Sequence, residues 1–154
     1  MSENKNPTAI KTSNKRTTAR LAAVQALYQM DIGDTSLEKI LVEFASHRLG
    51  QEIEGDQYLE ADHDFFSQIV KGVIKKQLEI DPLIDEKLSD EWPVSRIDAT
   101  LRAILRAGAF ELIGRKDIPQ KVVINEYVDV AKSFYQDDAA GMVNGVLDKV
   151  AKSL

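Results

Sequence analysis

Cysteine is absent from this chain of 154 residues, and histidine occurs only twice. The absence of cysteine excludes disulfides, thiolate nucleophiles, iron–sulfur clusters and zinc sites with sulfur ligands. Neither His47 nor His63 stands in a metal-ligand spacing, and we interpret both as surface residues at helix ends. We therefore expect no metal ion and no other cofactor.

Catalytic motifs and long apolar runs are missing as well. The chain has no glycine-rich phosphate loop and no nucleophile elbow, and adjacent acids such as Asp137 and Asp138 are explained by a helix start. No segment reaches the roughly 18 apolar residues of a membrane span, and the polar N-terminus lacks the apolar core of a signal peptide. We predict a cytoplasmic protein that is not an enzyme and does not enter a membrane.

The charge is unevenly distributed along the chain. The net charge is −5, but the first 20 residues hold five cations and one acid, which leaves −9 on the remainder. Such asymmetry is typical of a basic arm that meets a polyanion. The alternative is a solvated leader whose lysines only aid solubility.

Composition and length indicate one globular domain. The apolar fraction is 44% and the charged fraction 29%, as in ordinary folded proteins. Residues 1–14 are polar and show no periodicity, so we predict a disordered, basic leader there and a single domain over residues 15–154.

Apolar spacing is helical throughout the predicted domain. Three amphipathic helices come first, the third over residues 65–74, with an acidic loop at 50–62 between the second and third. Asp81 and Pro82 predict a short fourth helix that ends near Ser89. Ser95, with Asp98 three residues later, predicts the start of a fifth, and two more follow from Pro119 and from residues 136–138. The sequence therefore predicts an all-α fold, a compact bundle of about seven helices.

Three segments resemble the NusB family of bacterial transcription antitermination factors. The first is RTTARLAAVQALYQM at residues 16–30, and the second is LRAILRAGAFEL at 101–112. The third includes IPQKVVINEYV at 118–128, AKSF at 131–134 and VNGVLDK at 143–149. Together they span most of residues 16–150 in the family's order.

The resemblance implies transcription regulation by antitermination. Members of the family bind the single-stranded boxA element of nascent ribosomal RNA as a heterodimer with ribosomal protein NusE, and so help RNA polymerase read through terminators. The resemblance thus implies boxA-type RNA, NusE and the RNA polymerase antitermination complex as partners. It also implies a possible homodimer.

Candidate RNA contacts lie in the predicted first helix. Arg16 and Arg20 are four residues apart, share one helical face and are flanked by Lys15, so they can hold phosphates. Cations are unfavourable at a helix start, which favours a binding role over a merely solvated face. Tyr28 lies at the border of this face, where it either joins the core or reaches the surface.

The family's second RNA surface maps to the start of the last helix. It corresponds here to Asp138, Met142 and Asn144. Met142 stands where relatives often carry an aromatic residue, which weakens base stacking at this place. Asn144 with Gly145 can equally be a helix-packing pair.

Partner contacts are expected on the fifth and sixth predicted helices. Arg102 and Arg106 form a like-charge pair four residues apart, which only a partner or a buried acid would favour. Glu111 and Phe134 complete the predicted NusE-binding set, although Phe134 can also belong to the core.

Two other functions remain open from the sequence. One is a helical protein–protein adaptor that makes no direct RNA contact. The other is a fragment of an RNA-modifying enzyme, because the same helical module is similar to the RNA-binding domain of certain ribosomal-RNA cytosine methyltransferases. Because the given sequence ends at Leu154, we expect no catalytic domain.

Overall fold

The computed structural model describes residues 7–47, 62–88 and 93–154. These residues form helices and no strand, which confirms the all-α prediction. The helices are α1 (Pro7–Gly33), α2 (Leu37–His47), α3 (His63–Lys87), α4 (Ala99–Gly114), α5 (Gln120–Phe134) and α6 (Ala139–Lys152). Of the predicted acidic loop at 50–62, only Asp62 lies within the described residues.

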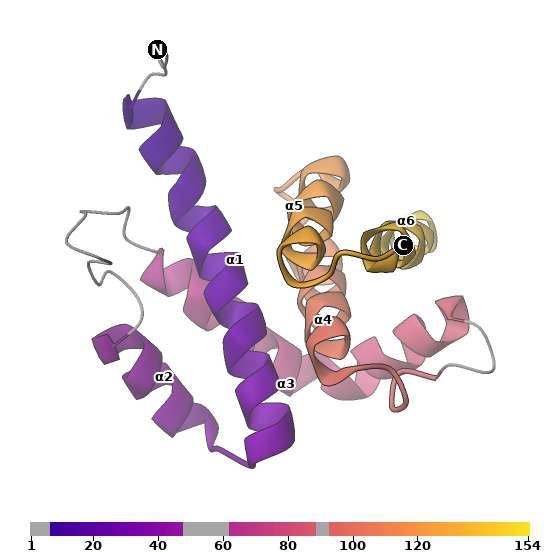
Figure 1. The fold of residues 1–154 in the computed structure, drawn as a ribbon, viewed down its shortest axis with the longest axis horizontal. Coiled ribbons are helices and arrows are strands. Elements are labelled where there is room, and N and C mark those ends of the chain that lie inside the picture. Colours follow the sequence, from indigo (N-terminus) through magenta and orange to yellow (C-terminus); the bar gives the residue numbers. More distant parts are fainter. Residues whose placement is uncertain (1–6, 48–61, 89–92) are drawn as a thin grey trace.

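Helix α4 occupies the centre of the bundle (Figure 1). It packs against α1 and α3 on one side and against α5 and α6 on the other, while α2 covers α1 and α3. Small residues allow these close approaches: a Cβ at Gly108 would lie 2.7 Å from a methyl carbon of Leu147 on α6. The alanine-rich stretch of α4 thus forms the core to which both halves of the chain attach.

Helix α3 corrects the predicted helix count. We expected separate helices before and after Asp81, but α3 continues through Pro82. Proline removes the hydrogen bond to the carbonyl four residues earlier, which is that of Leu78. Pro82 and Leu78 are both exposed, so this carbonyl lies on the solvent side, while Ile80 and Ile84 continue the buried face. The bundle therefore has six described helices instead of about seven.

The start of α4 also differs from the prediction. Ser95 was expected to cap the helix, but Asp98 is the cap and accepts a hydrogen bond from the backbone N–H of Leu101 at 3.4 Å. Residues 93–97 form a turn because Val94 and Ile97 are buried in the core. The N–H of Val94 is bound by the Asp85 carboxylate at 2.6 Å.

The remaining helix starts follow the sequence more closely. Helix α5 begins directly after Pro119, and the Asp137 side chain accepts a hydrogen bond from the N–H of Ala139 at the start of α6. Helix α1, expected from Lys15, begins at Pro7, a residue that fits a first helical turn. Part of the predicted leader is thus helical, and its first six residues lie outside the described chain.

Candidate functional site

The two arginines predicted to share one face of α1 occupy different environments. The side chain of Arg16 is 45% exposed, and Lys15 beside it is also exposed. Arg20, one turn later, is only 3% exposed. A phosphate can reach Arg16 directly, but it cannot reach Arg20 in this structure. The prediction of Arg20 as an accessible RNA contact is therefore wrong.

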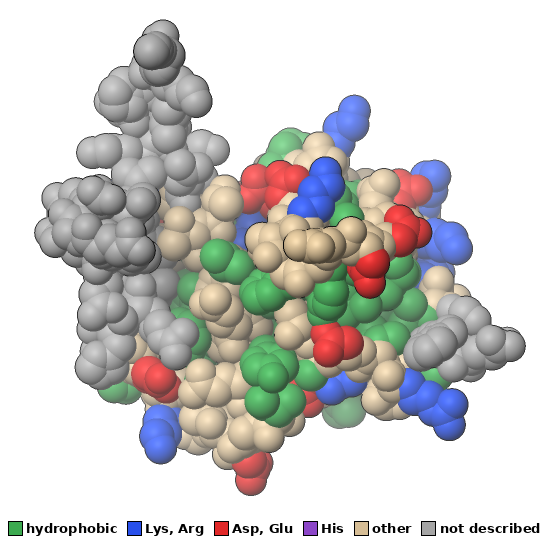
Figure 2. All heavy atoms as spheres, viewed as in Figure 1, with side chains coloured by type: hydrophobic (Ala, Val, Ile, Leu, Met, Phe, Trp, Pro, Cys, Tyr) green, Lys and Arg blue, Asp and Glu red, His purple; other side chains and the backbone are tan. Residues whose placement is uncertain are grey.

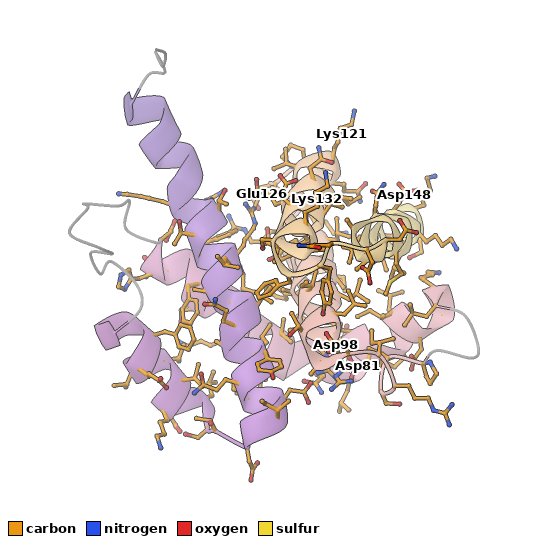
Figure 3. The ribbon with its side chains drawn as sticks, viewed as in Figure 1. Asp81, Asp98, Lys121, Glu126, Lys132 and Asp148 are labelled. Atoms are coloured by element: carbon orange, nitrogen blue, oxygen red, sulfur yellow. The ribbon has the colours of Figure 1, made fainter. Side chains whose placement is uncertain are left out.

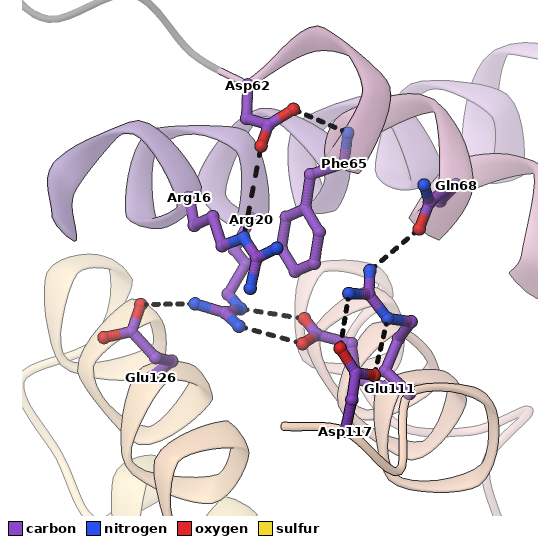
Figure 4. Close-up of polar contacts among 9 residues, drawn as sticks. Arg16, Arg20, Asp62, Phe65, Gln68, Glu111, Asp117 and Glu126 are labelled. Carbon is purple, nitrogen blue, oxygen red and sulfur yellow. Dashed lines mark hydrogen bonds and ion pairs between the residues drawn. The ribbon is translucent and has the colours of Figure 1, made fainter. Parts of the chain in front are cut away.

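Arg20 belongs to a buried ionic network (Figure 4). Its Nε and Nη2 donate to both carboxylate oxygens of Glu111, at 2.8 and 2.9 Å, and its Nη1 donates to Glu126 at 3.0 Å. The hydroxyl of Tyr127 donates to the same Glu111 carboxylate. Glu126 lies on the side of α5 that faces α1 (Figure 3). The network therefore ties α1, α4 and α5 together inside the protein.

Charge and burial shift the pKa values within this network. Burial alone would lower the pKa of Arg20, but the hydrogen bond and the negative charge of Glu111 raise it overall. Burial and then Glu111 raise the pKa of Tyr127 well above its ordinary value. Arg20 and Tyr127 are thus held in their protonated forms. Glu111 is completely buried, so its predicted role in contacting a partner is wrong.

Three arginines surround the ring of Phe65 at the start of α3 (Figure 4). Their guanidinium carbons lie 4.6 Å (Arg16), 4.8 Å (Arg20) and 5.3 Å (Arg115) from the ring centroid, which are cation–π distances. Phe65 itself is 2% exposed. Arg115 is not among the site residues predicted from the sequence. Apart from Asp117, its neighbours in the structure come from α1 and α3, and no local pattern reveals them.

Tyr28 and Phe134 meet in a surface groove of about 340 Å³. Tyr28 is 37% exposed and Phe134 42% exposed, and Ile32 and Thr100 also line the groove. Hydrophobic side chains are visible between α1 and α5 in Figure 2. Both residues thus reach the surface. Tyr28 was predicted to contact RNA and Phe134 to contact a partner protein, but the two line the same groove.

The predicted contacts at the start of α6 lie apart from Lys15 and Arg16 of α1. Helix α6 packs on α3, α4 and α5, and no described residue of α6 packs against α1. Asp138 and Asn144 are exposed, whereas Met142 is partly buried against the core. A Cβ at Gly145 would meet nothing within 4 Å. Asn144 and Gly145 are therefore surface residues and do not form a helix-packing pair.

Arg102 and Arg106 are neutralised within the chain. Arg102 Nε donates to Asp31 at 2.8 Å, and its Nη1 donates to the Ile97 carbonyl, also at 2.8 Å. Arg106 donates to both carboxylate oxygens of Asp81 at 2.8 Å, and its Nη1 lies 3.6 Å from Asp31. Acids of the same chain thus neutralise the like-charge pair, although Asp31 and Asp81, with side chains 24% exposed, are not the buried acid that the sequence suggested.

Metal and membrane features are not found in the described part of the chain. There, no group of three or more histidine or acidic side chains is arranged to hold a metal ion. None of its helices combines the length and apolar content needed to cross a lipid bilayer. His63 is exposed at the first position of α3, in agreement with its interpretation as a residue at a helix end.

Comparison with known proteins gives the same family over almost the whole chain. The NusB family profile matches residues 17–152. The transcription antitermination protein NusB of Rhizobium etli is 53% identical over 154 residues, which cover 100% of this chain and 96% of the relative. NusB of Rhodopseudomonas palustris is 56% identical over 146 residues, or 95% of this chain and 86% of the relative.

Solved structures agree with this assignment. NusB of T. maritima matches with a TM-score of 0.73 and 31% identity over 89% of this chain and 90% of that chain. A chain in a crystal structure of antitermination factors NusB and NusE in complex with dsRNA matches with a TM-score of 0.76 and 25% identity, over 92% and 98%. By sequence and by fold, the chain belongs to the NusB family.

Proposed function

We propose that this protein is a transcription antitermination factor. It binds boxA-type single-stranded RNA in nascent ribosomal transcripts as a heterodimer with ribosomal protein NusE, and it promotes read-through by RNA polymerase in the cytoplasm without catalysis. The observation that carries this proposal is similarity over nearly the full chain to NusB proteins, including one crystallised with NusE and RNA.

The RNA contacts proposed on α1 are Lys15 and Arg16. Both are exposed, and Arg16 rests on a buried aromatic ring that limits its motion. Arg20 supports this surface from inside through Glu111. Asp138, Met142 and Asn144 form a second proposed RNA surface on α6. Since the chain beyond residue 20 carries −9, we propose that NusE supplies further positive charge.

The groove between α1 and α5 is the proposed docking place for NusE. Phe134 and Tyr28 present aromatic surface there, the kind of residue that is enriched in protein interfaces. Arg102 and Arg106, although paired internally, lie on α4 and remain secondary candidates for this contact.

A gel-shift experiment tests the RNA contact. Arg16→Glu should abolish the shift of a boxA-type RNA while the variant still binds NusE, because it reverses an exposed cation without entering the core. Arg96→Glu is the matched control, since Arg96 is also exposed but lies in the turn before α4. Unchanged RNA binding by Arg16→Glu would favour the alternative of a protein–protein adaptor.

A pull-down with NusE tests the groove. Phe134→Ala should weaken NusE binding by about tenfold, because truncating a central aromatic residue of an interface typically costs more than 1 kcal/mol. Leu78→Ala is the control, because Leu78 is a 94% exposed apolar residue outside the groove. Equal NusE binding by both variants would place the interface elsewhere.

A further inference from the structure

Arg115 and Arg16 are the two accessible members of the arginine cluster around Phe65. Their side chains are 20% and 45% exposed, compared with 4% for Arg20. Arg20 is fully engaged with buried or partly buried carboxylates, so it serves the fold. Arg16 and Arg115 therefore offer two guanidinium groups at one surface point, at the junction of α1, α3 and the turn between α4 and α5.

The backbone around Arg115 is firmly held. Its N–H donates to the Glu111 carbonyl at 2.9 Å, and its own carbonyl accepts from the N–H of Ile118, which is buried. The guanidinium Nη1 donates to Gln68 on α3 at 2.8 Å. Both ends of the residue are thus fixed before any ligand arrives, which reduces the conformational entropy lost on binding.

Asp117 currently occupies the fork of the Arg115 guanidinium. Its two carboxylate oxygens accept from Nε at 3.0 Å and from Nη2 at 2.9 Å. An RNA phosphate presents two oxygens and one negative charge in similar geometry, so it can take the same place. The Asp117 side chain is 63% exposed, which leaves it free to be displaced into water.

Among the described residues, Asp62 is an acid that neutralises Arg16 only weakly. Asp62 Oδ2 lies 4.0 Å from Arg16 Nε, while the other oxygen of Asp62 caps α3 by accepting from the N–H of Phe65 at 3.0 Å. Exposed Lys15 and Lys116 stand next in sequence to the two arginines. Within the described residues, Arg16 thus has a weakly placed acid beside it and Arg115 a displaceable one.

We propose that Arg16 and Arg115 together bind the phosphodiester backbone of RNA, and that Asp117 occupies Arg115 as an internal competitor until RNA displaces it. This inference rests on the proposed function and adds to it a contact residue outside α1 and an acid that limits affinity. It predicts opposite effects on RNA affinity for substitutions of Arg115 and of Asp117, the two members of one ion pair.

Fluorescence anisotropy with a labelled boxA-type RNA tests this site in the full chain, alone and with NusE. Arg115→Gln should weaken RNA binding about tenfold, as expected for the loss of a charge-assisted bidentate contact. Asp117→Asn should strengthen binding by up to about fivefold, because an exposed ion pair contributes at most about that factor. A gain in affinity cannot result from misfolding.

The double variant Arg115→Gln/Asp117→Asn distinguishes competition between Asp117 and RNA for Arg115 from simple repulsion between Asp117 and RNA. In the Arg115→Gln background, Asp117→Asn should give no gain, because the site it would free no longer exists. Arg96→Gln and Glu86→Gln are matched controls that remove one charge of each sign; Glu86 is an exposed acid paired with Lys87 at the far end of α3. Both should bind RNA like the unmodified chain.

The outcomes distinguish failure of the proposed function from failure of the proposed site. If the unmodified chain binds no RNA, alone or with NusE, both the function and the site are overturned. If it binds RNA but Arg115→Gln binds equally well, only the site is overturned. A gain from Asp117→Asn that persists without Arg115, or that Glu86→Gln reproduces, would overturn the role of Asp117 as a competitor.

Discussion

Glu111 is the residue at which three helices are connected by charge. It lies on α4, is completely buried, and accepts hydrogen bonds from Arg20 of α1 and Tyr127 of α5. A buried ion pair contributes little over an apolar pair of the same shape, but removing one partner leaves an uncompensated charge. The network should therefore be strongly sensitive to substitution of a single member.

Glu111→Gln should lower the free energy of unfolding by about 3 kcal/mol, because Arg20 would keep only one anionic partner, Glu126. Urea denaturation followed by circular dichroism measures this. Asp148→Asn is the control, since it breaks an exposed pair with Lys152 and should change stability by less than about 1 kcal/mol. Similar losses of unfolding free energy in both variants would show that the buried charge of Glu111 matters no more to stability than an exposed one.

The titration of Asp117 gives a second test at this scale. The hydrogen bond from Arg115, with the positive charges of Arg115 and Arg16, lowers the pKa of Asp117 from 3.8 to about 2. Because the folded pKa is depressed, the stability that this group contributes is present above pH 3.8 and is lost as the pH falls through about 2.

The side-chain ¹³C chemical shift of Asp117 should follow this titration. In Arg115→Gln the pKa should return toward its ordinary value, because the principal cause of the shift is removed. The same midpoint in both proteins would mean that the ion pair does not form in solution.

At the scale of helices, close packing depends on particular glycines. A Cβ at Gly72 of α3 would lie 2.1 Å from a ring carbon of Phe110 on α4, so no side chain fits there without moving the ring. Gly145 in α6 is also inside a helix, but a Cβ there would meet nothing within 4 Å. The two positions allow the same substitution to be compared in opposite surroundings.

Gly72→Ala should destabilise the protein by about 1–3 kcal/mol through overpacking. Gly145→Ala should stabilise it by roughly 0.5–1 kcal/mol, because alanine favours a helix interior more than glycine does. Thermal and urea unfolding of both variants measure the difference. A stabilising Gly72→Ala would mean that α3 and α4 are not in close contact there.

Helices were predicted correctly where the apolar periodicity was regular. The predictions were wrong where tertiary contacts determined the helix boundaries. Proline statistics suggested a helix start at Asp81, yet the buried face of Ile80 and Ile84 continues α3 through Pro82. Burial of Val94 and Ile97 likewise moved the start of α4 from Ser95 to Asp98. Neither effect can be derived from local sequence, because the neighbours that bury these residues are distant in the chain.

The candidate site was predictable only in part for the same reason. Local sequence identified the exposed Arg16. The like-charge pair on α4 suggested a partner or a buried acid, and the structure shows the partly exposed Asp31 and Asp81 beside it. Arg20 was misplaced because its partners Glu111 and Glu126 are 91 and 106 residues away. Pairings of that range depend on the fold, not on helical spacing.

For the whole molecule, we expect the proposed basic surface and the acidic body to have opposite effects on the affinity for RNA. If Lys15, Arg16 and Arg115 each neutralise about one phosphate, the slope of log K against log salt concentration should be near −2, at roughly 0.7 per phosphate for single strands. Binding isotherms of the isolated protein between low and physiological salt measure this slope. A slope near zero would contradict direct contact with the RNA backbone.

Arg16 lies in the first half of α1 and Tyr28 in its second half, within a single uninterrupted helix. At 1.5 Å per residue, these two positions are about 18 Å apart along its axis. Because the stretch between them is packed into the core, this spacing cannot stretch or bend. If RNA binds at Arg16 and NusE at Tyr28, as we propose, α1 holds the two partners at a fixed separation.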